Sequence, residues 1–66
     1  MPVTEPSKQP VRVLLIDDHA LFRQSVAQSL ALDPNLRVEQ CASIRNALTL
    51  LSQQPFDLVL LDHDLG

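Results

Sequence analysis

The sequence has few of the residues that could cross-link so small a chain. It has 66 residues and one cysteine, Cys41, so it forms no internal disulfide, and no cysteine and histidine set has zinc-finger spacing. We expect Cys41 to be a small core residue, which suits a reducing cytosol. A chain of this length holds one domain at most, and such a domain buries only about 60% of its unfolded surface. Its 45% of hydrophobic residues must therefore supply the core.

The sequence also lacks a basic patch, a long apolar run and a secretion signal. Its five basic residues are scattered and its net charge is -3, so we expect no nucleic-acid binding through this segment. No apolar run approaches the roughly 18 residues of a membrane span, so we expect no membrane contact. Residues 1–10 contain three prolines and no apolar signal core, which predicts a disordered tail and a cytoplasmic protein.

Three short apolar stretches predict β-strands. Residues 11–16 are aliphatic almost throughout, which is typical of a strand buried on both faces in a parallel sheet. Residues 36–41 alternate apolar and polar side chains, as expected for a half-exposed strand at a sheet edge. Residues 56–61 form a third apolar run.

Two stretches with helical spacing lie between these strands. Residues 20–32 carry an apolar stripe, and Asp33-Pro34 ends the helix because the residue before a proline leaves the helical region. Ser43 is a suitable cap for a second helix, which Gln53-Gln54-Pro55 ends. The apolar stripe of this second helix comprises Ile44, Ala47, Leu48 and Leu51. The order β-α-β-α-β predicts an α/β fold with parallel strands.

Carboxylates follow two of the predicted strands. Asp17 and Asp18 come directly after strand 11–16, and Asp62 comes directly after strand 56–61. Ligands gather at the carboxyl ends of parallel strands, so neighbouring strands would bring three carboxylates into one cleft. Like charges about 4 Å apart repel by roughly 4 kcal/mol at an effective dielectric constant near 20, so the cluster needs protons or a cation. Oxygen ligands with room for water favour Mg²⁺.

Each carboxylate also has an ordinary structural interpretation. Asp18 would cap the first helix, Asp17 would be a solvated loop residue, and Asp62 would cap a further helix. The acidic pair after the first strand, combined with an aspartate after the third, favours a shared site over three separate roles.

The stretches "VRVLLIDDHALFRQSVAQSL" and "LRVEQCASIRNALTLLSQQPFDLVLLDHDLG" resemble the receiver domain of bacterial two-component response regulators. The wording "DDHALFR" is similar to the NarL/FixJ type. The resemblance covers residues 11–66 and rests on the acidic pair, the "LLD" element and their spacing together. It implies a flavodoxin-like receiver fold, of which residues 11–66 would be the amino-terminal half.

The resemblance also implies a role for each aspartate. Asp62 matches the phosphoacceptor, which takes a phosphoryl group from a phosphohistidine on a sensor histidine kinase. Asp17 and Asp18 match the acidic pair that binds Mg²⁺ directly or through water. Asp64 stands where the family uses a backbone carbonyl as a further Mg²⁺ ligand. The segment would be a signalling module and not an enzyme.

A complete receiver would extend beyond Gly66. The resemblance implies two more strands, one bringing a Ser or Thr and the other a Lys to the phosphorylation site. It also implies a C-terminal helix-turn-helix, through which alone we expect DNA binding and control of transcription. Another receiver domain is a second candidate partner. Strand 56–61 is central in the family's sheet, so its edge is an aggregation hazard without the following strand.

Some residues depart from the family or carry no assigned role. Gly66 stands where the family commonly has proline, which affects a turn. The Asp64 side chain either points to solvent or tightens metal binding. His19 and His63 flank the aspartates, either as exposed imidazoles or as nitrogen ligands of a transition-metal site.

Two other functions stay open. Asp62-His63-Asp64 resembles the first motif of haloacid-dehalogenase-type phosphohydrolases, with a nucleophile and a general acid/base. That motif normally ends the first strand, and the hypothesis leaves Asp17 and Asp18 without a role. A truncated half-receiver would alternatively act only by docking on a kinase or an intact receiver, or be inert.

Overall fold

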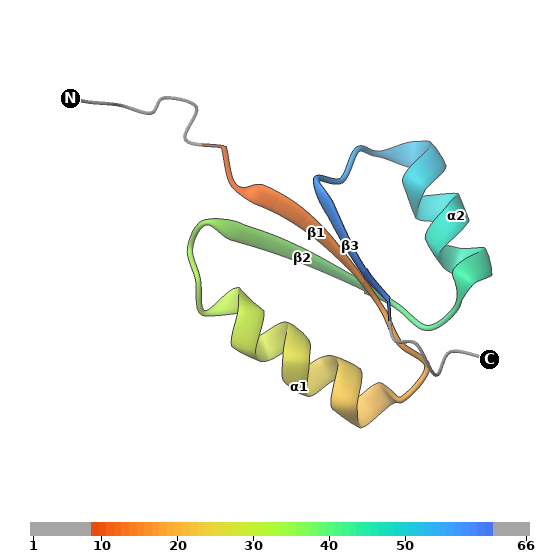
Figure 1. The fold of residues 1–66 in the computed structure, drawn as a ribbon, viewed down its shortest axis with the longest axis horizontal. Coiled ribbons are helices and arrows are strands. Elements are labelled where there is room, and N and C mark those ends of the chain that lie inside the picture. The colour runs from red at the N-terminus through yellow and green to blue at the C-terminus, as the bar shows by residue number, and fades with distance from the viewer. Residues whose placement is uncertain (1–8, 62–66) are drawn as a thin grey trace.

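The computed structural model describes residues 9–61. The elements in chain order are β1 (Val11–Ile16), α1 (Ala20–Ala31), β2 (Leu36–Cys41), α2 (Ile44–Gln53) and β3 (Leu58–Leu61). The predicted β-α-β-α-β order is confirmed (Figure 1). The predicted tail falls almost entirely on residues 1–8, which lie outside the described residues, so the tail stays a prediction.

The three strands form one parallel sheet in the order β2-β1-β3. β1 pairs with β2 over its whole length, from Val11 opposite Leu36 to Ile16 opposite Cys41. On its other side β1 pairs with β3, and the last partners are Ile16 and Leu61. After α2 the chain crosses β1, and β3 pairs with the edge of β1 opposite to β2. β1 is therefore the central strand of the three.

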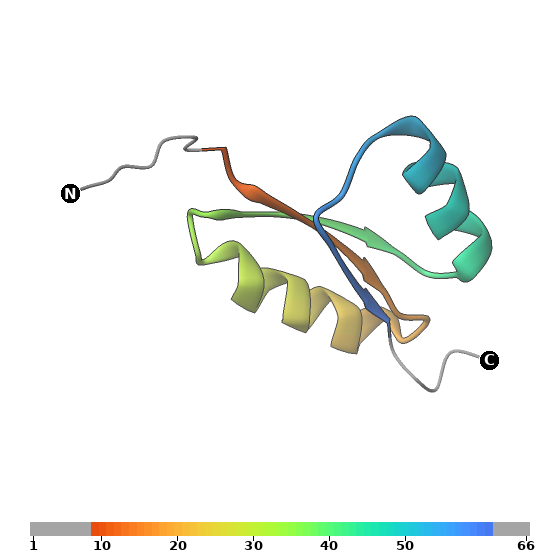
Figure 2. The same ribbon diagram turned by 45° about the horizontal axis from the view of Figure 1, so that its top comes forward.

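The two helices cover opposite faces of the sheet (Figures 1 and 2). On the face of α2, the buried residues Leu14, Ile16, Cys41 and Ala47 form one cluster, with Leu50 and Phe56 packed against it. On the other face, α1 buries Ala27. Because side chains alternate along a strand, β1 supplies apolar side chains to both layers. The arrangement is an α/β fold with parallel strands, as the order of the elements predicted.

The burial of β1 and of Cys41 follows the predictions. Residues 13–16 are all buried, as the continuous apolar run indicated for a strand covered on both faces. β2 lies at an edge of the sheet and is exposed at three of its six residues, as its alternating sequence predicted. Cys41, at the end of β2, is buried in the apolar cluster.

The helix predicted from the apolar stripe is confirmed as α2, but little of the stripe is buried. Ala47 is buried, whereas Ile44, Leu48 and Leu51 are exposed. Leu50, outside the stripe, packs on the cluster. The helix approaches the sheet through the small side chain of Ala47.

The third strand is shorter than predicted and lies at the second edge of the described sheet. It begins at Leu58, two residues later than the predicted range 56–61. Asp57 precedes it and is joined to Arg12 twice: its N–H donates to the Arg12 carbonyl at 2.8 Å, and its carboxylate accepts from the Arg12 N–H at 2.9 Å. Leu58, Val59 and Leu61 are exposed along β3.

Capping and turn bonds set the helix boundaries. The Ser43 hydroxyl accepts a hydrogen bond from the Asn46 N–H at 3.1 Å, which confirms Ser43 as the cap of α2. α1 ends at Ala31, one residue before the predicted Leu32, and the Leu32 N–H donates to the Ser29 carbonyl at 3.3 Å in a tightened last turn. Within residues 9–61, no helix is long and apolar enough to cross a membrane.

Candidate functional site

Asp17 lies immediately beyond β1 and is almost completely buried, with 1% of its surface exposed. Its N–H continues the sheet by donating to the Cys41 carbonyl at 3.1 Å. Its carboxylate accepts a hydrogen bond from the His19 N–H at 2.8 Å, which turns the chain away from the strand. A buried carboxylate held in this way cannot be a solvated loop residue, and that alternative is excluded.

Asp18 and His19 form the exposed side of the same cluster. The Asp18 side chain is 47% exposed, and its Oδ1 lies 3.0 Å from Nδ1 of His19. The same His19 nitrogen lies 3.3 Å from Oδ1 of Asp17, so one imidazole touches both carboxylates. The N-cap residue of α1 is His19, and its side chain makes no capping hydrogen bond. Asp18 is therefore not the helix cap that its position after a strand suggested.

Arg23 holds this loop in place, a role that the sequence reasoning missed. Its Nη1 donates to the Asp17 carbonyl at 2.8 Å, and its Nε donates to Oε1 of Gln40 at 3.2 Å. The Arg23 N–H also donates to the His19 carbonyl at 2.8 Å, the first hydrogen bond of α1. One residue thus ties α1, β2 and the carboxyl end of β1 together. The helical spacing that put Arg23 in the first turn of α1 was the only available signal.

The other predicted site residues follow β3. Asp62, His63 and Asp64 lie outside the described residues. The structure describes β3 up to Leu61, which pairs with Ile16, the residue before Asp17. β1 and β3 are therefore neighbours that end at the same edge of the sheet, as the predicted cleft requires.

Comparison with known proteins identifies the family. The response regulator receiver domain matches residues 13–66. The chain belongs to this family. The described residues have the parallel β-α-β-α-β arrangement expected of the first part of a receiver fold.

Curated relatives carry receivers like this one in longer proteins. The chain is 37% identical over 96% of its length to a protein-glutamate methylesterase/protein-glutamine glutaminase of *Rhodospirillum centenum*, covering 17% of that protein. It is 36% identical over 86% of its length to the nitrate/nitrite response regulator protein NarP of *Escherichia coli*, covering 27% of it. A second methylesterase/glutaminase, from *Anaeromyxobacter dehalogenans*, is 38% identical, with 17% of its length covered. The chain thus covers about a quarter or less of the length of each relative.

No solved structure matches the chain significantly. The family match is to a receiver domain, whereas the phosphohydrolase hypothesis leaves Asp17 and Asp18 without a role.

The donor set at the carboxyl end of β1 fits the metal that receivers bind in an acidic pocket. Asp17, Asp18 and His19 each offer one ligand atom, and these atoms all lie within 4.8 Å of one another. The two carboxylates are hard oxygen ligands, and the exposure of Asp18 leaves room for the water that Mg²⁺ retains. Nδ1 of His19 adds a nitrogen donor. Of the two histidines predicted as alternative transition-metal ligands, His19 is the one that lies within the described residues.

An apolar groove adjoins the buried carboxylate of this receiver. It has a volume of about 270 Å³ and lies between α1 and β3. Its lining comprises Leu15, Asp17, Phe22, Val26, Leu60 and Leu61. Asp17 is the charged residue among those that line it, and the other lining residues are apolar.

Proposed function

We propose that this receiver is the phosphoacceptor module of a two-component phosphorelay and that Asp62 takes a phosphoryl group from a phosphohistidine on a sensor histidine kinase. The observation that carries the proposal is the pair of carboxylates at the end of β1, of which Asp17 is buried. Nδ1 of His19 lies 3.3 Å from the Asp17 carboxylate and 3.0 Å from that of Asp18. The strand that leads to Asp62 is the neighbour of β1, and Asp17 and Asp62 are the residues that follow the paired Ile16 and Leu61.

The transfer is a substitution at phosphorus. A carboxylate oxygen of Asp62 forms a new P–O bond as the P–N bond to the kinase histidine breaks. The imidazole nitrogen keeps the electron pair of the broken bond. No acid or base in the receiver is required to make the nucleophile, because an aspartate is ionised at neutral pH.

The acidic pair has a separate task in this proposal. Asp17 and Asp18 would hold Mg²⁺ together with a carboxylate oxygen of Asp62 and the backbone carbonyl of Asp64. Bound Mg²⁺ neutralises charge on the transferring oxygens. Asp17, being buried and tied to the Cys41 carbonyl, is a fixed ligand, whereas the exposed Asp18 can bind directly or through water.

The output of the native-length protein is a further proposal. The likeness to NarP supports control of transcription, with DNA bound only through a C-terminal helix-turn-helix beyond these residues. Two methylesterase/glutaminase relatives of similar identity support a second candidate, an enzymatic output domain. In both cases the receiver acts in the cytoplasm, with the kinase as its partner and pairing with another receiver as a second interaction. The receiver segment itself is proposed to be no enzyme.

Phosphorylation of the native-length protein tests this function. Incubation with acetyl phosphate and Mg²⁺ should add one phosphoryl mass in intact-protein mass spectrometry, and EDTA should prevent the addition. Asp62→Asn should abolish the added mass. Asp64→Asn is the matched control, because only the backbone carbonyl of Asp64 is assigned a role, and it should still be phosphorylated.

Persistence of the added mass in Asp62→Asn would refute the assignment of the phosphoacceptor. Absence of any added mass in the unmodified protein, with both acetyl phosphate and a phosphorylated kinase, would instead favour the docking or inert alternative. Binding to an intact receiver without phosphorylation, measured by calorimetry, would then identify docking.

A further inference from the structure

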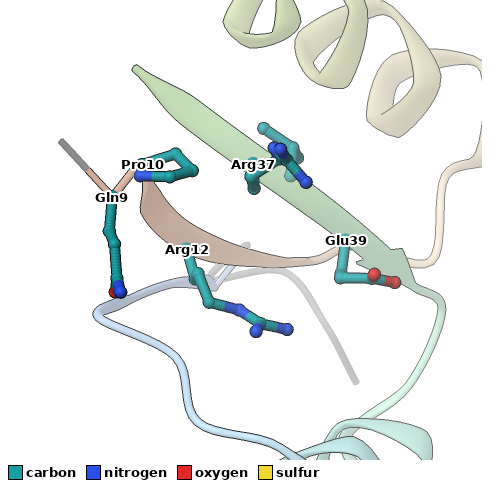
Figure 3. Close-up of a pocket in the computed structure, with 6 residues that line it drawn as sticks. Gln9, Pro10, Arg12, Arg37 and Glu39 are labelled. Carbon is teal, nitrogen blue, oxygen red and sulfur yellow. The ribbon is translucent and has the colours of Figure 1, made fainter. Parts of the chain in front are cut away.

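A second pocket lies away from the acidic cluster. It has a volume of about 330 Å³ and opens beside the amino-terminal halves of β1 and β2 (Figure 3). We call it the Arg12–Arg37 pocket. Its lining comprises Gln9, Pro10, Arg12, Arg37, Val38 and Glu39. Asp17 lies five positions after Arg12 along the chain, about 16 Å at the rise of a strand, so this pocket is distinct from the phosphorylation site.

Two arginines stand side by side in this pocket. Arg12 on β1 and Arg37 on β2 are direct partners in the parallel register. Register partners on neighbouring parallel strands project to the same face, and like charges placed opposite each other there are destabilising. Both arginines line the same pocket, so an anion bound there is attracted by two positive charges.

The Arg12 side chain is already held in place by uncharged partners. Its Nη2 donates to Oε1 of Gln54, and its Cζ lies 5.6 Å from the centre of the Phe56 ring. Asp57 accepts from the backbone N–H of Arg12 and not from its guanidinium. The guanidinium therefore keeps its full charge while its position is set by neutral groups, which reduces the entropy lost when a ligand binds.

Arg37 and Glu39 complete the pocket from β2. Arg37 is exposed, and within residues 9–61 its side chain makes no hydrogen bond or ion pair, so its donors are available. Glu39 lines the same pocket. Its one negative charge and the two positive charges of the arginines give the lining residues a net charge of +1. Planar guanidinium groups bind two oxygens of a carboxylate or phosphate at once.

We propose that the Arg12–Arg37 pocket binds a small molecule through an oxyanion group, a phosphate or a carboxylate. A volume of about 330 Å³ is that of a small-ligand pocket. The site belongs to the amino-terminal edge of the sheet, so its ligand acts independently of the phosphoryl group at the carboxyl edge.

Titration of the native-length protein with inorganic phosphate and with succinate tests the proposal. EDTA is present and ionic strength is kept constant with sodium chloride, so that neither metal nor general screening contributes. The readout is the Nε–Hε signals of the arginines in ¹H–¹⁵N NMR spectra. We expect saturable shifts of Arg12 and Arg37 with at least one of the two anions. Saturation by phosphate alone assigns a phosphate-bearing ligand, and saturation by succinate alone assigns a carboxylate.

Charge-matched variants separate this pocket from general attraction to arginine. Arg37→Gln should raise the dissociation constant about ten-fold, as expected for loss of one charged hydrogen-bond donor. Arg45→Gln removes the same charge from an exposed position on α2 outside the pocket and should leave binding unchanged. Glu39→Gln should tighten binding, because it removes the one carboxylate that lines the pocket.

Shifts that stay linear in both anions, or equal effects of Arg37→Gln and Arg45→Gln, would overturn the proposal. Because Arg37 is exposed, its variant should fold, and an unchanged circular dichroism spectrum verifies this. Failure here leaves the assignment of Asp62 untouched, since phosphorylation is measured separately at the other edge of the sheet.

Discussion

Replacing Asp18 with asparagine should make the protein more stable without metal and less stable with it. The ligand atoms of Asp17 and Asp18 lie within 4.8 Å of each other. At that distance two negative charges repel by about 3.5 kcal/mol at an effective dielectric constant near 20. The Asp18 side chain is 47% exposed and contacts His19, so solvent and the imidazole reduce the repulsion to about 1 kcal/mol.

Asp18→Asn removes this repulsion and leaves the N-cap residue of α1, His19, unchanged. We therefore expect the free energy of unfolding without metal to rise by about 1 kcal/mol, a Tm increase of roughly 4–8 °C for a domain of this size. Mg²⁺ at 100 times its dissociation constant should stabilise the unmodified protein by about 2.7 kcal/mol. The variant should lose most of that gain, so the order of the two stabilities reverses.

The assay is urea unfolding of the native-length protein, followed by circular dichroism in EDTA and in a series of Mg²⁺ concentrations. Glu39→Gln removes the same charge from β2 and should respond to Mg²⁺ as the unmodified protein does. A variant at Asp18 that is less stable in EDTA would show that this carboxylate has a structural role. An undiminished Mg²⁺ response in Asp18→Asn would refute its assignment as a metal ligand.

Two further predictions, each with its control variant, concern the core packing and the helix cap that support the site. Leu14→Ala should lower the free energy of unfolding by about 2–5 kcal/mol, because Leu14 is fully buried in the central strand. Leu32 is 84% exposed, so Leu32→Ala should change it by less than about 0.5 kcal/mol in the same urea titration. Ser43→Ala should lower the free energy of unfolding by about 1 kcal/mol, because it removes the acceptor of the Asn46 N–H, whereas Ser43→Asp should retain the cap. Equal losses of stability in both variants would contradict the capping role.

The order of the elements could be predicted because the strands differ in their apolar patterns. The continuous run over 11–16 belongs to the strand that is covered on both faces, and the alternating run over 36–41 belongs to an edge. The inner face of α2 could not be predicted in the same way. Ile44, Leu48 and Leu51 satisfy helical spacing but are exposed. The helix approaches the sheet at Ala47, where a small side chain allows it.

The start of β3 shows a similar limit of pattern reading. Phe56 is apolar and so extended the predicted strand, yet its ring packs on the cluster beneath α2 and faces the Arg12 guanidinium. Asp57 then bonds the Arg12 backbone through both its N–H and its carboxylate. The paired strand begins only after this side-chain connection, which no count of apolar residues reveals.

The carboxylates of the candidate site could be predicted from adjacency in sequence, but their support could not. Asp17 and Asp18 follow β1 directly, so any parallel sheet places them at its carboxyl edge. What makes Asp17 a fixed ligand is its bond to the Cys41 carbonyl and the bond from Arg23, and both depend on how β2 and α1 pack. Because positioning supplies much of the catalysis in phosphoryl transfer, these contacts matter as much as the aspartates themselves. The acidic residues thus indicate the family, whereas the position of Asp17 depends on Arg23 of α1 and on Cys41 of β2.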